Sequence, residues 1–185
     1  MIEIRKDRDF YGMEGGVTFS GGECLLQADF VAEVMLRCRE EGISTAVDTC
    51  GFVPWERIQK TLRVCDTYLY DIKCADSGLH QTFTGQPNEL ILENFRKLSA
   101  SGARIWIRIP VIPGFNNHES EMKIMADLVN GMPGVETVTL MPYHTLGKSK
   151  YETLGMEPRY HTDQMIQPAE LEHFGRLFEK WERLQ

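Results

Sequence analysis

Small and polar residues that could bind a ligand gather where predicted strands end. The stretch "GGVTFSGGE" (residues 15–23) stops a β-rich run at Gly21, Gly22 and Glu23. Glycines let a ligand or another chain lie against bare peptide groups, although a tight strand-to-helix turn is an equally good interpretation. The stretch lacks the Lys-Ser or Lys-Thr pair of a phosphate-binding loop and the spacing of a dinucleotide-binding glycine motif.

Two aspartates predict a cation site. Asp48 and Asp71 end consecutive predicted strands, so their carboxylates should converge on one edge of a sheet. Neighbouring carboxylates raise each other's pKa unless a cation or a donor lies between them. With the Thr49 hydroxyl as a further oxygen ligand, the three residues suit a cation. Helix capping or a structural salt bridge is the alternative for either aspartate.

Basic residues also lie in or near the ends of predicted strands. Lys73 lies two residues after Asp71 and points to the same face, where it can neutralise the acids or hold a ligand carboxylate. Arg108 interrupts the apolar stretch "WIRIPVIPG" and needs a partner in the protein or in a ligand. His144 follows another strand end. A loop histidine is more often a surface residue than a ligand, but the position of His144 beside the other sites raises the ligand-binding interpretation. No nucleophile or general base is recognisable, Cys50 being interpreted as a small buried residue, so we predict no catalytic side chain.

Strands and helices alternate along the chain. The predicted strands are Gly16–Ser20, Ser44–Asp48, Tyr68–Lys73, Arg104–Val111 and Glu136–Met141. The predicted helices are Asp29–Glu41, one from Pro54, Glu89–Ala100, Ser120–Asn130 and Pro168–Arg183. Nearly continuous apolar strands predict a parallel sheet buried on both faces. In an open sheet or a barrel of this class, ligands bind at the carboxyl ends of the strands.

Composition limits the function further. A chain of 185 residues suits a single domain over residues 1–185, and its net charge of −7 argues against nucleic-acid binding. No apolar stretch could span a bilayer, and no signal peptide is recognisable. The five scattered cysteines indicate neither a zinc site nor a disulfide framework, which predicts a reducing cytoplasm.

Five motifs resemble those of one family. "GGVTFSGGE", "VDTCG", "YDIK", "IRIPVIPG" and "PYHTLGKSKY" occur in the order and spacing found in glycyl-radical-enzyme activating enzymes. These are radical S-adenosylmethionine (SAM) oxidoreductases of anaerobic metabolism, among them the activator of pyruvate formate-lyase. The resemblance covers roughly residues 15–155 and implies a partial (β/α)6 TIM-like barrel of parallel strands.

The resemblance also implies a cofactor site. The backbone of Gly21, Gly22 and Glu23 would receive the methionine ammonium group of SAM. The positions that would hold its carboxylate, ribose and adenine are Asp48, Lys73, Arg108 and His144. A monovalent cation would bind at Asp48, Thr49 and Asp71. In the family a [4Fe-4S] cluster reduces SAM, and the resulting radical takes a hydrogen atom from a glycine of the partner enzyme.

The sequence departs from the family at the cluster. No Cys-x-x-x-Cys-x-x-Cys loop is present, so we expect the isolated chain to be inactive. Five strands are predicted here against six in the family, and the missing strand should be the first. The chain therefore resembles the carboxyl-terminal part of a longer enzyme. Its "IEIRKDRDFYG" segment suits the end of the helix that precedes the family's second strand. The exposed edge at Gly16–Ser20 should favour self-association.

The expected partners are a glycyl radical enzyme and a flavodoxin- or ferredoxin-type electron donor, with no nucleic acid and no membrane. Motifs such as "DTCGFVPWE" and "GKSKYETLG" resemble activators of glycerol or diol dehydratases and related decarboxylases more than activators of pyruvate formate-lyase. A module that binds a nucleotide or partner without redox chemistry is one alternative function. A cation-dependent barrel lyase is another.

Overall fold

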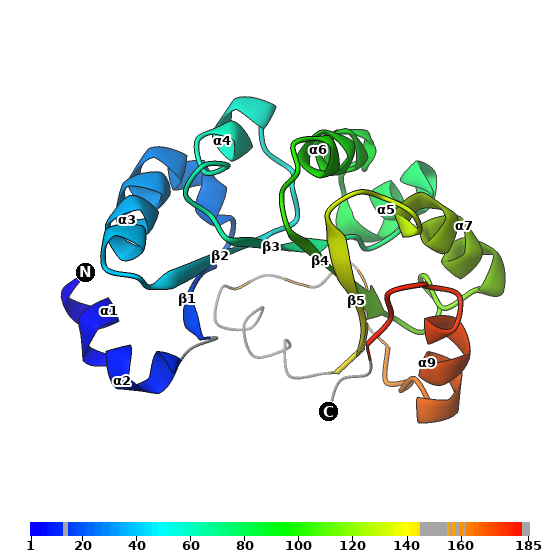
Figure 1. Cartoon of the computed structure of the whole chain (residues 1–185). Helices are drawn as coiled ribbons and strands as arrows, with labels where there is room; N and C mark the ends of the chain where they lie inside the picture. The colour runs from blue at the N-terminus through cyan, green and yellow to red at the C-terminus, as the bar shows by residue number, and fades with distance from the viewer. Residues whose placement is uncertain (13–14, 145–154, 156, 158–159, 161, 183–185) are drawn as a thin grey trace. The chain divides into compact units, whose positions relative to one another are not determined.

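The structure is a computed structural model that describes residues 1–12, 15–144, 155, 157, 160 and 162–182. Its five strands form one sheet in sequence order (Figure 1). They are β1 (Gly16–Phe19), β2 (Ser44–Thr49), β3 (Thr67–Asp71), β4 (Ile105–Val111) and β5 (Val135–Pro142). The helices are α1 (Ile2–Lys6), α2 (Arg8–Tyr11), η1 (Cys24–Gln27), α3 (Ala28–Glu40), α4 (Trp55–Gln59), α5 (Ser77–Thr84), α6 (Glu89–Ala100), α7 (Glu119–Val129) and α9 (Pro168–Gly175).

The predicted α/β architecture with parallel strands is confirmed. β1 pairs with β2 from Gly16 opposite Ser44, and β2 pairs with β3 from Ala46 opposite Thr67. Each of these neighbouring strands is reached through helical segments, as a parallel connection requires. Such a sheet gathers the carboxyl ends of its strands on one edge.

The chain forms two compact units. The first contains residues 1–71, 90–107 and 133–136. The second contains residues 72–89, 108–132 and 137–185, so that β4 and β5 each contribute to both units. The single domain over residues 1–185 stays a prediction.

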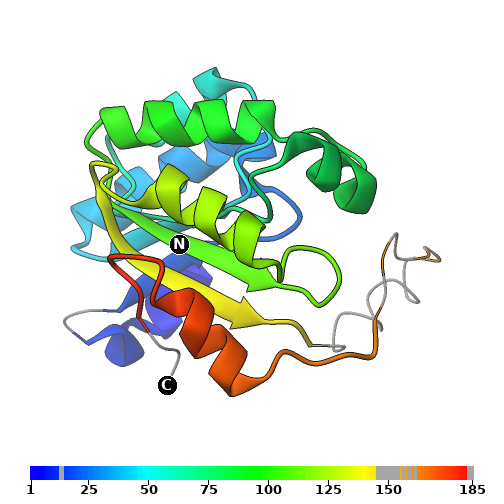
Figure 2. The same cartoon turned by 90° about the vertical axis from the view of Figure 1, so that its right-hand side faces the viewer.

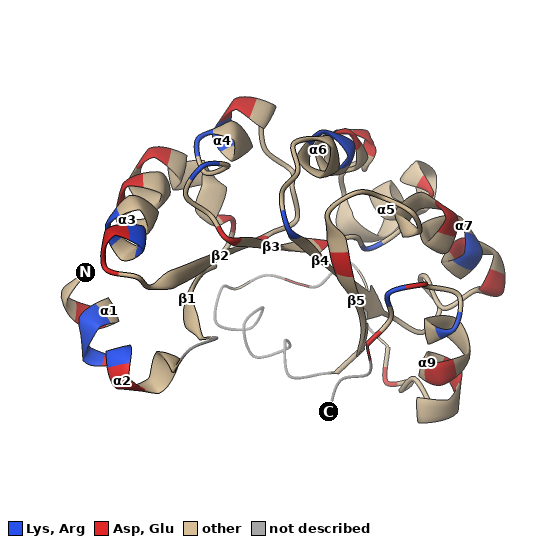
Figure 3. Ribbon diagram, viewed as in Figure 1, with Lys and Arg blue, Asp and Glu red and all other residues tan. Residues whose placement is uncertain are grey.

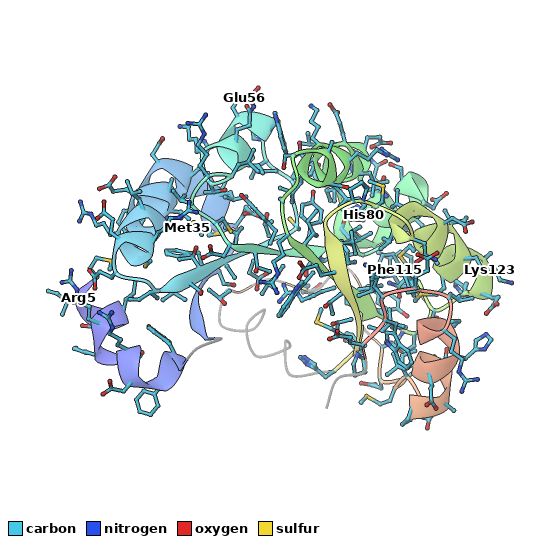
Figure 4. The ribbon with its side chains drawn as sticks, viewed as in Figure 1. Arg5, Met35, Glu56, His80, Phe115 and Lys123 are labelled. Carbon is cyan, nitrogen blue, oxygen red and sulfur yellow. The ribbon has the colours of Figure 1, made fainter. Side chains whose placement is uncertain are left out.

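In the first unit, helices cover one face of the strands. Figure 1 shows α3, α4 and α6 on the same side of β2 and β3, and Met35 of α3 points toward the sheet whereas Glu56 of α4 points away (Figure 4). Along β2, Val47 is buried and Asp48 is half-buried, in strict alternation. In the part of the chain that the structure describes, the side chains on the other face of β2 and β3 are half-buried or exposed, so the prediction that the strands are buried on both faces is not confirmed for these two strands.

In the second unit, α7 and α9 lie on one side of β5 (Figures 1 and 2). Met122 and Met125 of α7 are buried together with Ile109 and Val111 of β4. Phe115, in the loop after β4, stacks on Phe83 of α5 with ring centroids 4.3 Å apart. This core supports the loops that follow the strands.

Three helical segments differ from the predictions. The last helix ends at Gly175 rather than Arg183, because the chain turns there and Val138 donates to the Lys180 carbonyl at 2.9 Å. The helix α5 was not predicted; its amino terminus depends on the Asp76 carboxylate, which accepts from Leu79 N at 2.6 Å. The amino-terminal segment is interrupted at Asp7, between α1 and α2.

Charged side chains cover the outer faces of the helices. Figure 3 shows both signs of charge interspersed along α3 and α7. Pairs one helical turn apart include Arg37 with Glu33 at 2.8 Å and Lys123 with Glu119 at 3.0 Å. Among the described residues, no helix is both long enough and apolar enough to cross a membrane.

Candidate functional site

The loop after β1 presents bare backbone. Gly21 has φ = 132°, which L-residues rarely adopt, and both Gly21 and Gly22 are exposed. A Cβ atom added at either glycine would meet nothing within 4 Å. The open space beside these peptide groups is therefore available to a ligand.

The Glu23 carboxylate fixes this loop. One oxygen, Oε1, accepts from Leu25 N at 3.1 Å at the start of η1. The other, Oε2, accepts from the Thr49 hydroxyl at 2.8 Å and from Cys50 N at 3.3 Å. A single carboxylate thus joins the glycine loop to the end of β2, an anchoring role that the sequence did not reveal.

Thr49 belongs to this cluster. Its side chain is buried, and strand alternation places it on the face opposite Asp48. Its hydroxyl donates to Glu23 and accepts from Gly51 N at 2.9 Å. This placement differs from the prediction that Thr49 joins Asp48 and Asp71 around a cation, because strand geometry turns successive side chains to opposite faces.

The two aspartates do share a face. Asp48 is paired with Leu69, and Asp71 lies two residues further along β3, so the carboxylates occupy diagonal positions on neighbouring strands. Both residues are half-buried. Among the described residues, no group of three or more His, Cys, Asp or Glu side chains could hold a metal ion. A cation at Asp48 and Asp71 stays a prediction.

The glycine loop also touches Asp48. The Ser20 hydroxyl donates to Asp48 Oδ2 at 3.2 Å. Nearby, the Cys24 thiol donates to the Phe19 carbonyl at 3.3 Å, and burial raises the pKa of this thiol to about 11. Cys24 is therefore a protonated anchor of the loop, and Cys50 is half-buried rather than buried as predicted.

The basic residues belong to the second unit. Arg108 is half-buried in the middle of β4 rather than at its end, since β4 continues to Val111. Its carbonyl nevertheless accepts from Ile72 N at 3.1 Å, immediately after β3 has ended. Lys73 is half-buried in the loop that follows, and His144 is exposed two residues after β5. The remainder of the "PYHTLGKSKY" motif, residues 145–151, lies outside the described residues.

Buried amides support the loops, and sequence reasoning missed them. In the first unit, Asn94 is fully buried on α6 and donates to the carbonyls of Gly51 and Val53, at 2.8 Å each. In the second, Asn88 donates to the Cys74 carbonyl at 2.8 Å. Asn94 falls on the same helical stripe as buried Ile91 and Leu98. An amide on an apolar stripe was the available signal.

Comparisons with known proteins identify the family of this chain. Residues 2–126 match the family model of the radical SAM superfamily. The trans-4-hydroxy-L-proline dehydratase activating enzyme of Clostridioides difficile is 42% identical over 183 residues, which cover 96% of this chain and 60% of that protein. The (2S)-3-sulfopropanediol dehydratase activating enzyme of Klebsiella oxytoca is 42% identical over 159 residues, 84% of this chain and 50% of that protein.

A solved structure matches over nearly its whole length. The crystal structure of a domain of pyruvate-formate lyase-activating enzyme from Bacteroides vulgatus has a TM-score of 0.76 and 32% identity, and covers 92% of this chain and 99% of that one. By contrast, the chain spans 60% or less of the two curated relatives. The chain belongs to the radical SAM superfamily, among the glycyl-radical-enzyme activating enzymes.

Proposed function

We propose that this chain is the SAM-binding barrel of an activase that generates a glycyl radical on a partner enzyme. The observation that carries the proposal is the loop of Gly21 and Gly22, held at the end of β2 by Glu23. The 32% identity to a domain of pyruvate-formate lyase-activating enzyme supports the same function.

Each of the two units carries groups of the kind that SAM would need. The methionine ammonium group would donate to backbone carbonyls of the glycine loop, where a Cβ atom would meet nothing within 4 Å. Lys73 and Arg108 supply positive charge for the methionine carboxylate, and Asp48 and His144 supply polar groups for ribose and adenine. Glu23 contributes through its backbone, since its carboxylate is engaged with Thr49 and Cys50. A monovalent cation at Asp48 and Asp71 would offset their charge.

The described residues do not fit a [4Fe-4S] cluster. Three of the five cysteines, Cys24, Cys38 and Cys74, are buried singly, and no cysteine triad of the family spacing occurs in the sequence. In the family, the cluster supplies the electron that cleaves SAM. We therefore propose that the 185-residue chain alone forms no radical. Anaerobic reconstitution with iron, sulfide and dithionite should yield no 5′-deoxyadenosine; near-stoichiometric product would contradict this.

The names of the relatives suggest a class of partner. They include activating enzymes of a trans-4-hydroxy-L-proline dehydratase, a (2S)-3-sulfopropanediol dehydratase and a 4-hydroxyphenylacetate decarboxylase. We propose a glycyl radical enzyme of the dehydratase or decarboxylase group as partner, a flavodoxin or ferredoxin as electron donor, and a cytoplasmic location.

Calorimetric titration of the chain with SAM tests the proposed function, with Mg²⁺ as the competing ligand class. Saturable binding of SAM and none of Mg²⁺ is expected. Gly21→Ala should weaken SAM binding about tenfold, because a strained loop misaligns the acceptor carbonyls. Gly42→Ala is the matched control, since Gly42 also has positive φ (69°) and open space but lies at the amino end of β2. Equal affinities of the two variants, or Mg²⁺ binding alone, would contradict the proposal.

A further inference from the structure

The side-chain amide of Asn116, just before α7, is fully buried and has a partner for each polar atom. Its Nδ2 donates to the carbonyls of Lys73 and Pro110, at 2.7 Å each. Its Oδ1 accepts from Ile112 N at 2.8 Å. One amide therefore connects the loop after β3 to Pro110 and Ile112 at the end of β4.

The position of this amide follows from the parallel ladder. Ile72 donates to the Arg108 carbonyl at 3.1 Å, and in a parallel ladder it would next accept from residue 110. Residue 110 is Pro110, which has no N–H, so the ladder stops. The following ladder residue would be Cys74, donating to Pro110 and accepting from Ile112.

The Asn116 amide makes those two bonds instead. It donates to Pro110 and accepts from Ile112, as the peptide groups of Cys74 would in a continued strand. The backbone of Cys74 is turned to other partners: its carbonyl accepts from Asn88 at 2.8 Å. Asn116 thus substitutes for one residue of β3, so that the chain leaves the sheet at Lys73 while the end of β4 stays hydrogen-bonded.

We propose that Asn116 is a positioning residue for Lys73 in SAM binding, an inference that rests on the proposed function. The third hydrogen bond of the amide, to the Lys73 carbonyl, fixes the backbone position from which the Lys73 side chain extends. The buried Glu121 carboxylate holds the next peptide group by accepting from Ala75 N. Asn116 does not itself contact the ligand and acts through Lys73.

Asn116→Asp is the sharpest substitution, because it keeps the shape and the acceptor for Ile112 but removes both donated bonds. Asn130→Asp is its matched control. Asn130 ends α7, donates to the Leu177 carbonyl at 2.9 Å and accepts from Glu179 N at 3.0 Å, so the same change removes a donated bond away from the strand ends. If Asn116→Asp fails to fold, Asn116→Ser, which keeps one donor, replaces it.

The test is calorimetric titration with SAM. It compares the wild type, Asn116→Asp, Asn130→Asp, Lys73→Met and the double variant that combines Asn116→Asp with Lys73→Met. The wild type, the two single variants at Asn116 and Lys73, and their double variant form a thermodynamic cycle. We expect Asn116→Asp to weaken binding about tenfold and Asn130→Asp to leave it within about twofold. In the Lys73→Met background, Asn116→Asp should change affinity by less than about twofold, because the residue through which it acts is gone.

Two results overturn the inference alone: wild-type affinity in Asn116→Asp, or an equal loss from Asn116→Asp with and without Lys73. Failure of the folded wild type to bind SAM is a different result. It overturns the proposed function, and the positioning role with it.

Discussion

At the scale of single residues, the sequence predicted where candidate ligand-binding groups lie but not which hydrogen bonds hold them in place. Gly21, Gly22 and Asp48 are close to one another, because Ser20 and Glu23 link the glycine loop to β2. Spacing alone could not reveal the Glu23 interactions, since its partners on β2 are 26 and 27 residues away along the chain. Long-range hydrogen bonds of this kind leave no periodic pattern.

Glu23→Ala should destabilise the chain more than removal of an ordinary surface carboxylate. The change leaves the buried Thr49 hydroxyl and the N–H groups of Leu25 and Cys50 without their acceptor, a loss of about 2–3 kcal/mol. Glu33→Ala is the control, because Glu33 pairs with Arg37 on the exposed side of α3, for a loss of about 0.5 kcal/mol. Urea unfolding measures both free energies, and equal losses would contradict the anchoring role of Glu23.

The Cys24 thiol should react slowly with alkylating reagents at neutral pH. Burial first, and then the negative charges of Glu23 and Asp48, raise its pKa from 9.0 to about 11. The folded state thus binds this proton more tightly than the unfolded state, so its contribution to stability is complete below pH 9 and is lost as the pH rises toward about 11. Iodoacetamide labelling read by mass spectrometry measures how fast the Cys24 thiol reacts, with urea-unfolded protein as the control. Equal labelling of the folded and unfolded chain at pH 8 would contradict the raised pKa.

At the scale of elements, strands were predicted well and helices less evenly. Apolar runs bounded by turn residues placed all five strands to within about two residues of their bounds. The short helix α5 escaped because it depends on the Asp76 cap rather than on a long apolar stripe. The last helix was predicted too long because its amphipathic pattern continues past Gly175, where pairing of Trp181 with Val138 turns the chain instead.

The turn after β2 should accept no side chain at Gly51. This residue has φ = 71°, and an added Cβ would overlap the Tyr70 ring, whose hydroxyl donates to the Ile91 carbonyl at 2.7 Å. Gly51→Ala should therefore lower the free energy of unfolding by about 3 kcal/mol or more, from strain plus overpacking. Gly42→Ala, with φ = 69° and open space, carries the strain alone, about 1 kcal/mol. Similar losses in the two variants would show that the Tyr70 contact is unimportant.

At the scale of the whole molecule, alternation of strands and helices predicted the α/β class, and the family resemblance supplied the barrel. The division into two compact units was not predicted. It has no composition signal, because both β4 and β5 pass from one unit into the other without a linker. The acidic and glycine positions fall in the first unit, and Lys73, Arg108 and His144 fall in the second.

The edge strand β1 should promote self-association. It ends the order of strands in the described sheet, with β2 as its one neighbour there. Unpaired backbone groups on such an edge can pair with another chain. Sedimentation should show association that rises with concentration and is reduced by Thr18→Lys on β1, but not by Thr82→Lys on the exposed surface of α5. A monomer at all concentrations would contradict this prediction.

The central claim is that SAM binds at the carboxyl ends of the strands, and a ¹H–¹⁵N NMR titration of the chain with SAM tests it most directly. The account predicts saturable shifts of the Gly21, Gly22 and Lys73 amide signals, whereas Gly42 and Gly102, which precede β2 and β4, stay unchanged. A pocket of about 710 Å³ in the first unit, lined by Gly15, Gly16, Ser44, Asp66, Arg104 and Trp106 among others, lies at the opposite, amino ends of the strands. Shifts confined to that pocket, or no saturable shifts, would contradict the account.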